Sequence, residues 1–267
     1  MIIRDVNFGA NNSLDGIIAR ENGDPAETSI IFLHGFLADC RGDENKARVK
    51  IYCEKAPESG FNGLTFSFRG HGKSKGKRGS ISKTQLVEDI GSAVEFVRKE
   101  FGTETIYLCG SSTGATGALY YTAENGGINR LVLISPYTSF DNINLSEKQR
   151  KALEEYYATY KKTGIDVYLP FSRTDKLDEE LTKKFPISSY YWLQHMNGIE
   201  IAKKVNVPCL VICGLNDGWV NPSSIKKLYS NLRSDSKELR EYDDTHSLEN
   251  HEHEVIEDIF GFLDGIK

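Results

Sequence analysis

The chain has 267 residues, of which 39% are hydrophobic, and its formal net charge is −5. This size supports one large core without requiring a second one. The mixed charge, with no long basic block, argues against nucleic acid or an anionic membrane surface as the main partner. No apolar run approaches membrane-spanning length, and charged residues occur as early as Arg4 and Asp5, so neither a transmembrane segment nor a secretory signal is expected.

The five cysteines are odd in number, and three of them (Cys109, Cys209 and Cys213) lie in strand-like apolar runs. Buried, reduced thiols explain this pattern most simply, and they favour a cytoplasmic location. The sequence leaves the oligomeric state open.

Short apolar runs alternate with helical patterns along most of the chain. In chain order, the first half predicts a hairpin at Phe8 and 14–20, a strand at 29–33, a helix at 45–56, a strand at 63–68, a helix at 82–101, a strand at 105–109 and a helix after Ser112. The second half predicts strands at 130–134 and 207–213, a helix at 222–230, a strand at 238–242 and a helix at 251–263. Such alternation implies right-handed crossovers and a mostly parallel sheet covered by helices on both faces.

Residues 137–200 interrupt this alternation with a charged, tyrosine-rich segment. Helical patterns occur around 147–160 and 175–184, and a structureless loop of this length is uncommon in a compact domain. We therefore expect a helical cap over the strand ends where such sheets bind ligands. Two roles stay open for its aromatic residues, which either line an apolar substrate pocket or pack the cap onto the body. These residues are Tyr156, Tyr157, Tyr160, Tyr190, Tyr191 and Trp192.

The most informative motif is the pentapeptide Gly110–Gly114, a Gly-x-Ser-x-Gly pattern between the strand at 105–109 and a run of small, helix-like residues. Gly110 and Gly114 allow the chain to turn so tightly that the side chain of Ser112 stands above the sheet. The positive N-terminus of the next helix lies beside it. Ser112 is therefore the candidate nucleophile.

A serine hydroxyl needs a base to take its proton, and the base needs an acid that fixes its tautomer. Asp217 follows the strand at 207–213, and His246 follows the strand at 238–242. Asp243 and Asp244 are rival acids, but they lie too near His246 in sequence to reach behind its ring easily. The rival bases His251 and His253 fall at the start of the last helix instead of in the preceding loop. The histidines and glutamates at 246–254 match no strong metal-ligand spacing, and no metal is expected there.

Four motifs give the chain a resemblance to the α/β-hydrolase superfamily over nearly its whole length. They are Leu33-His34-Gly35-Phe36, the loop 68–74 with Arg69-Gly70-His71-Gly72, the elbow at Ser112, and the loops of Asp217 and His246. The chain order Ser, Asp, His is the one expected of that fold. The arginine–glycine loop and the cap are similar to the branch of serine aminopeptidase-like hydrolases, monoacylglycerol lipases and feruloyl esterases. The resemblance implies an eight-stranded sheet, with a core of residues 1–136 and 201–267 and a cap at 137–200 inserted after the sixth strand.

The resemblance also implies an oxyanion hole built by the backbone N–H groups of Phe36 and Thr113, with His34 in a structural role. The expected activity is cytoplasmic hydrolysis of a small or acyl-chain ester by Ser112, His246 and Asp217, without metal or organic cofactor. Thioesterase and amidase or aminopeptidase activities, or a ligand receptor that retains the fold, are the alternatives. The basic run Lys73–Arg78 is expected to be a solvated loop, with a handle for a phosphate-bearing substrate as its alternative.

Overall fold

The computed structural model describes residues 1–42, 48–143, 145–171 and 183–265. Its centre is an eight-stranded sheet with the order β1-β2-β4-β3-β5-β6-β9-β10. The strands are β1 (Ile2–Phe8), β2 (Leu14–Arg20), β3 (Thr28–Leu33), β4 (Asn62–Phe66), β5 (Thr105–Ser111), β6 (Arg130–Ile134), β9 (Cys209–Gly214) and β10 (Lys237–Tyr242). The pairings β1·β2 and β2·β4 are antiparallel and the other five are parallel, so the predicted mostly parallel sheet is confirmed.

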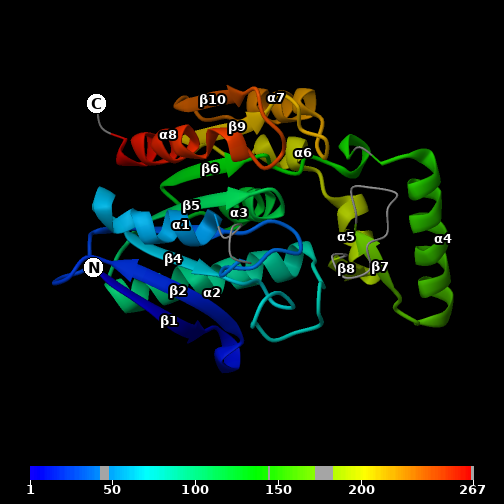
Figure 1. Cartoon of the computed structure of the whole chain (residues 1–267), viewed down its shortest axis with the longest axis horizontal. Helices are drawn as coiled ribbons and strands as arrows, with labels where there is room; N and C mark the ends of the chain where they lie inside the picture. The colour runs from blue at the N-terminus through cyan, green and yellow to red at the C-terminus, as the bar shows by residue number, and fades with distance from the viewer. Residues whose placement is uncertain (43–47, 144, 172–182, 266–267) are drawn as a thin grey trace.

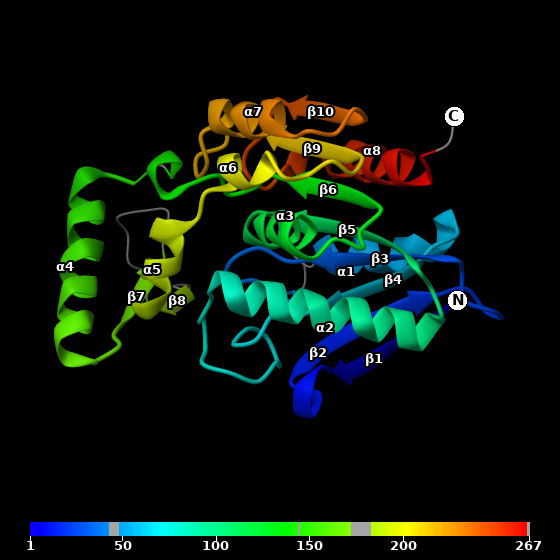
Figure 2. The same ribbon diagram turned by 180° about the vertical axis from the view of Figure 1, so that it is seen from behind.

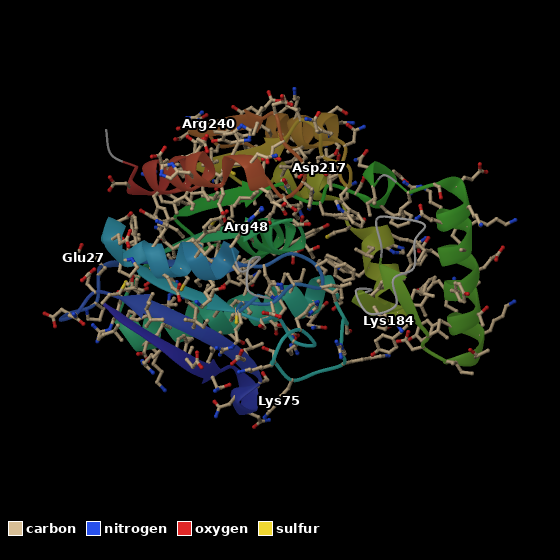
Figure 3. The ribbon with its side chains drawn as sticks, viewed as in Figure 1. Glu27, Arg48, Lys75, Lys184, Asp217 and Arg240 are labelled. Carbon is tan, nitrogen blue, oxygen red and sulfur yellow. The ribbon has the colours of Figure 1, made fainter. Side chains whose placement is uncertain are left out.

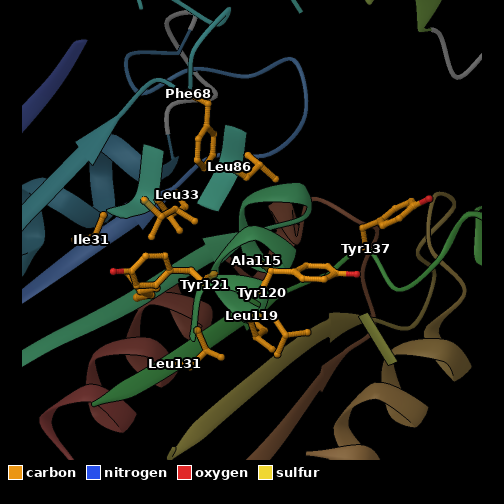
Figure 4. Close-up of a cluster of buried hydrophobic side chains, with 14 of the residues drawn as sticks. Ile31, Leu33, Phe68, Leu86, Ala115, Leu119, Tyr120, Tyr121, Leu131 and Tyr137 are labelled. Carbon is orange, nitrogen blue, oxygen red and sulfur yellow. The ribbon is translucent and has the colours of Figure 1, made fainter. Parts of the chain in front are cut away.

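Helices cover both faces of this sheet (Figures 1 and 2). The helices α1 (Arg48–Lys55) and α8 (Glu252–Asp264) pack on one face, and α2 (Lys83–Phe101), α3 (Thr113–Asn125) and α7 (Pro222–Asn231) pack on the other. Strand β3 shows why both faces are needed, because its side chains alternate between them. Ile31 and Leu33 join the α2 and α3 side, which Figure 4 shows, whereas Ile30 and Phe32 join the α1 and α8 side.

Helix α2 illustrates how closely local signals fix an element. The Ser82 side chain accepts a hydrogen bond from the Gln85 backbone N–H at 3.1 Å, which caps the first turn as the sequence predicts. Gly102, with φ of 68°, ends the helix in the left-handed conformation. Its expected apolar face is buried, and it comprises Leu86, Ile90, Val94 and Val97.

Other predicted boundaries shift by a few residues. Helix α1 begins at Arg48 among the described residues, since 45–47 lie outside them, and it continues into the 3₁₀ turn η2 (Ala56–Ser59). Strand β4 ends at Phe66, two residues earlier than predicted. Three further 3₁₀ turns are short connections at η1 (Ala10–Asn12), η3 (Phe140–Asn142) and η4 (Glu249–His251). No helix in the described ranges combines the length and apolarity that a membrane span requires.

Between β6 and β9 the chain leaves the sheet and forms an insertion beside the carboxyl ends of the parallel strands (Figure 1). It contains α4 (Glu147–Thr163), a hairpin of β7 (Tyr168–Phe171) and β8 (Lys183–Pro186), α5 (Ser188–His195) and α6 (Gly198–Ala202). Helix α4 begins at a full capping box formed by Ser146 and Gln149, and it contains the predicted helix at 147–160.

The second helix predicted in this segment, at 175–184, falls mostly outside the described residues. Residues 175–182 lie outside the described residues, and 183 and 184 belong to strand β8. The antiparallel register pairs Leu169 with Phe185, and Lys184 is exposed whereas Phe185 is buried. The last two residues of the predicted helix therefore lie in a strand, where pairing with β7 determines the backbone conformation.

Candidate active site

Ser112 lies at the sharp turn between β5 and α3. Its backbone has φ 52° and ψ −117°, an unfavourable conformation for a residue with a Cβ atom, and its N–H donates to the Ile134 carbonyl oxygen at 2.8 Å. A Cβ atom on Gly110 would lie 2.6 Å from the backbone of Ala115, and one on Gly114 would lie 2.4 Å from the His34 carbonyl oxygen. Both glycines of the motif are therefore required by close backbone approach.

Asp217 lies in the loop after β9 and is 5% exposed (Figure 3). Its Oδ1 atom accepts hydrogen bonds from the backbone N–H groups of Trp219 at 2.7 Å and Val220 at 3.0 Å. Its Oδ2 atom lies 2.7 Å from Nδ1 of His246. One carboxylate oxygen thus fixes the side chain in its loop, and the other is directed at the imidazole.

His246 follows β10 and connects the other two side chains. Its Nε2 atom lies 3.1 Å from Oγ of Ser112, and its backbone carbonyl oxygen accepts a hydrogen bond from the Ser135 hydroxyl at 3.1 Å. Residues that span 134 positions of the chain therefore form one hydrogen-bonded line from Ser112 through His246 to Asp217. With Nδ1–H donating to the carboxylate, Nε2 is free of a proton and can accept one from the serine hydroxyl.

The rival acids and bases make other contacts. Asp244 accepts hydrogen bonds from the backbone N–H groups of Thr245 and Asn250, and its Oδ2 atom lies 3.1 Å from Nδ1 of His251. Asp243 accepts a hydrogen bond from the Asn216 side chain at 2.7 Å. Hydrogen bonds to its charged form hold the pKa of Asp244 below its usual value against the opposing effect of burial. Asp244 therefore stabilises its own loop and the start of the last helix.

The loop after β3 approaches Ser112 from the opposite side. A Cβ atom on Gly35 would lie 3.2 Å from Cβ of Ser112, so this loop passes close to the nucleophile candidate. His34 is buried, and its Nε2 atom accepts a hydrogen bond from the Phe68 backbone N–H at 3.0 Å, as its expected structural role requires. Thr113 is the first residue of α3, where backbone N–H groups have no partner inside the helix. Phe36 and Thr113 both line a cavity that Ser112 and His246 also line.

This cavity has a volume of about 310 Å³ and opens over Ser112 and His246. Its apolar lining residues include Tyr137, Ile143, Leu193, Trp219 and Val220. Its polar lining residues include Asp39, Arg48, Ser247 and Glu249. The sequence around Tyr137 and Leu193 does not mark either residue as part of a cavity wall, because each reaches the cavity only through the packing of the insertion.

The six aromatic residues singled out in the insertion do not line this cavity. The ring of Tyr157 instead packs against the rings of Tyr160, Tyr190 and Tyr191, with centroids 5.5 to 6.2 Å apart, and Tyr190 is fully buried. These contacts pack α4 against α5 within the insertion, so they support neither a lining role at this cavity nor, by themselves, packing of the cap onto the body.

The basic run Lys73–Arg78 does not line the cavity either. The Lys75 ammonium donates to the Asn11 carbonyl oxygen at 2.8 Å, and Lys77 forms an ion pair with Asp166. The four lysine and arginine side chains of this run are exposed, which fits the expected solvated loop. Within the ranges that the structure describes, no three His, Cys, Asp or Glu side chains form a group that could hold a metal ion.

Residues 24–254 match the family model described as serine aminopeptidase, S33. The chain belongs to that family of hydrolases. A carboxylesterase from Bacillus subtilis (strain 168) is 23% identical over 248 residues, which cover 89% of this chain and 93% of that protein. The resemblance to the α/β-hydrolase superfamily and to its aminopeptidase and lipase branch is confirmed.

Solved structures support the same fold. The structure of DcsB in complex with its substrate analogue has a TM-score of 0.81 and 19% identity, and the match covers 98% of each chain. Monoacylglycerol lipase from Paleococcus ferrophilus has a TM-score of 0.72 and 19% identity, and the match covers 99% of each chain. At these identities the likeness establishes the fold, so the chemistry must be argued from this chain's own residues.

Proposed function

We propose that this hydrolase cleaves a carboxylic ester through Ser112, His246 and Asp217, with an acyl-enzyme intermediate. The observation that carries the proposal is the hydrogen-bonded line of these three side chains, with distances of 3.1 and 2.7 Å, in which Ser112 and His246 line a cavity. A serine hydroxyl outside such an arrangement is a weak nucleophile.

In the proposed reaction Ser112 Oγ attacks the ester carbonyl carbon while His246 Nε2 takes the hydroxyl proton. Asp217 stabilises the imidazolium that forms, and it does not itself become protonated. The backbone N–H groups of Phe36 and Thr113 donate to the negative oxygen of the tetrahedral intermediate. His246 then protonates the leaving alcohol, and a water molecule activated by the same imidazole hydrolyses the acyl-enzyme. Apart from this water molecule, the proposed chemistry uses side chains and backbone amides of this chain.

The apolar residues that line the cavity bear on the substrate. Tyr137, Ile143 and Leu193 line the same cavity as Ser112 and suit a hydrocarbon part of the ester, because burial of apolar surface stabilises binding by about 25 cal/mol per Å². These three residues belong to the segment 137–200. We therefore propose that this segment acts as a cap and contributes to acyl selection, with 1–136 and 201–267 as the hydrolase core.

The expected reducing compartment is compatible with the cysteines. All five thiols are free and buried. Burial raises the pKa of the Cys40 thiol to about 11, which keeps it protonated and unreactive at neutral pH. We propose a cytoplasmic location on this ground.

A substrate panel tests the proposed function. The panel contains p-nitrophenyl esters of graded chain length, a feruloyl ester, and matched thioester and amide substrates. We expect multiple turnovers with an ester, and faster turnover of the ester than of the matched thioester or amide. Ser112→Ala should lower kcat by about 10⁴-fold or more. Ser92→Ala, on the exposed side of α2, is the matched control and should retain full activity. Equal ester turnover by wild type and Ser112→Ala would refute the assignment, and a single stalled acylation would indicate a receptor.

A further inference from the structure

The aromatic ring of Phe36 is in contact with the insertion. Phe185 of strand β8 meets it edge-on, with ring centroids 5.7 Å apart and an interplanar angle of 65°, and Phe185 is 3% exposed. The ring of His71, from the arginine–glycine loop, lies 6.4 Å from Phe36 on the same centroid measure. A residue whose backbone is proposed to bind the oxyanion therefore has its side chain held by two segments outside its own loop.

The loop after β3, the loop 69–80 and strand β8 also approach one another at Leu37, the residue after Phe36. A Cβ atom on Gly79 would lie 2.8 Å from the Lys184 carbonyl oxygen and 3.3 Å from both Cα of Phe185 and the Leu37 side chain. Lys184, labelled in Figure 3, marks this hairpin in the view. Leu37 has φ of 55°, an unfavourable value for a residue with a branched side chain, and such a backbone persists only where its surroundings hold it.

The hairpin itself is tied to the core, so it can act as a fixed support. Asp166, just before β7, forms an ion pair with Lys77 and accepts a hydrogen bond from the Ser188 backbone N–H at 3.0 Å. The Ser189 hydroxyl accepts a hydrogen bond from the Ile81 backbone N–H at 3.1 Å. These contacts place β8 and the start of α5 in a defined position relative to the loop 69–80.

We infer that Phe185 is a positioning residue, which holds the loop 35–38 so that the Phe36 N–H group points at the developing oxyanion. This inference rests on the proposed function for its catalytic consequence. Removal of the Phe185 ring leaves a void beside Phe36, and the strained backbone at Leu37 favours relaxation of the loop into it. A displacement near 1 Å at a reacting centre is enough to lower a rate by about 100-fold. The oxyanion hole stabilises mainly the transition state, so loss of the Phe185 ring should change kcat more than KM.

The test compares Phe185→Ala and Phe185→Leu with Phe140→Ala. Phe140 is a matched control because it is also a buried phenylalanine of the insertion, but its ring packs on Tyr190, 5.2 Å away. Three quantities are measured: kcat and KM for a p-nitrophenyl ester, inhibition by a trifluoromethyl ketone, which forms a tetrahedral adduct with an oxyanion, and amide hydrogen exchange of residues 35–38. The last quantity does not depend on turnover, and it includes the Ala38 N–H that donates to the Gly35 carbonyl oxygen at 3.2 Å.

For Phe185→Ala we expect kcat to fall by about 10- to 100-fold with KM within threefold, a parallel loss of affinity for the trifluoromethyl ketone, and faster exchange at 35–38. The midpoint of the pH–rate profile should not move, because His246 and Asp217 are untouched. Phe185→Leu should recover most of kcat, and Phe140→Ala should leave all three quantities near wild type.

Unchanged exchange at 35–38 in folded Phe185→Ala would overturn the inference, as would a kcat within twofold of wild type. If the alanine variant does not fold, exchange in Phe185→Leu decides in the same way. A wild-type protein that neither turns over esters nor forms an acyl adduct at Ser112 would instead refute the proposed function. The exchange data would still decide whether Phe185 holds the loop.

Discussion

Replacement of Asp217 by asparagine should remove activity through the tautomer of His246. The side-chain oxygen of the introduced amide must face the Trp219 and Val220 N–H groups, because an NH₂ group there would meet the two donors that now lie 2.7 and 3.0 Å from the carboxylate. The NH₂ group then faces His246 Nδ1 and donates to it. The ring proton moves to Nε2, which can no longer accept the proton of Ser112. A wrong tautomer in such a triad costs about 10⁴-fold in kcat, equivalent to about 5 kcal/mol of transition-state stabilisation.

The assay is steady-state hydrolysis of the best p-nitrophenyl ester at neutral pH, with the melting temperature measured in parallel. Asp217→Asn should keep a near-normal melting temperature, because both loop hydrogen bonds survive. Asp243→Asn is the matched control and should retain activity, since its carboxylate is exposed and accepts a hydrogen bond from the Asn216 side chain. Retention of kcat within tenfold by Asp217→Asn, or an equal loss in folded Asp244→Asn, would refute the assignment of the acid.

Three further changes test the architecture around the site. Gly35→Ala places a Cβ atom 3.2 Å from that of Ser112, so we expect kcat to fall by about tenfold in steady-state assays with the fold intact, and an unchanged kcat would contradict this contact. Gly114→Ala meets backbone oxygen at 2.4 Å and should lower the unfolding free energy measured in urea by about 3 kcal/mol or more, whereas Gly91→Ala, whose nearest neighbour would be a ring atom at 3.5 Å, should be neutral or stabilising by up to about 1 kcal/mol. Burial raises the pKa of Asp89 from 3.8 to about 6. The contribution of this carboxyl group to the unfolding free energy is therefore fully present below about pH 4, and it is lost as pH rises through 6. Relative to Asp89→Asn, wild type should lose up to about 3 kcal/mol between pH 4 and 7 in urea titrations, and a flat difference would contradict the raised pKa.

The sheet could be predicted from the sequence because its signals are local. In β3 and β9 the apolar runs are continuous, since both faces are buried, and such runs are readable without knowledge of any partner strand. Helix α2 carries its own cap and its own apolar face. The hairpin β7–β8 could not be predicted, because its strands are four residues each and depend on pairing between Leu169 and Phe185 across an intervening segment.

The positions of Ser112, Asp217 and His246 could be predicted from the sequence for a different reason. Each follows a predicted parallel strand, and the carboxyl ends of such strands lie at one edge of the sheet, so the three side chains were expected to meet. Their distances agree with that expectation, and their catalytic roles stay a prediction. The wall residues Tyr137 and Leu193 carry no comparable signal, because the packing of the insertion alone determines which of its side chains reach the cavity.

The most direct measurement is the intact mass of the protein quenched within milliseconds of mixing with a slowly deacylating p-nitrophenyl ester. Formation of an ester bond at Ser112 predicts a species heavier by one acyl group, which peptide mapping locates at this serine and which disappears as product acid accumulates. Turnover without any such adduct in wild type, or an adduct of the same yield in Ser112→Ala, would contradict nucleophilic catalysis by this residue.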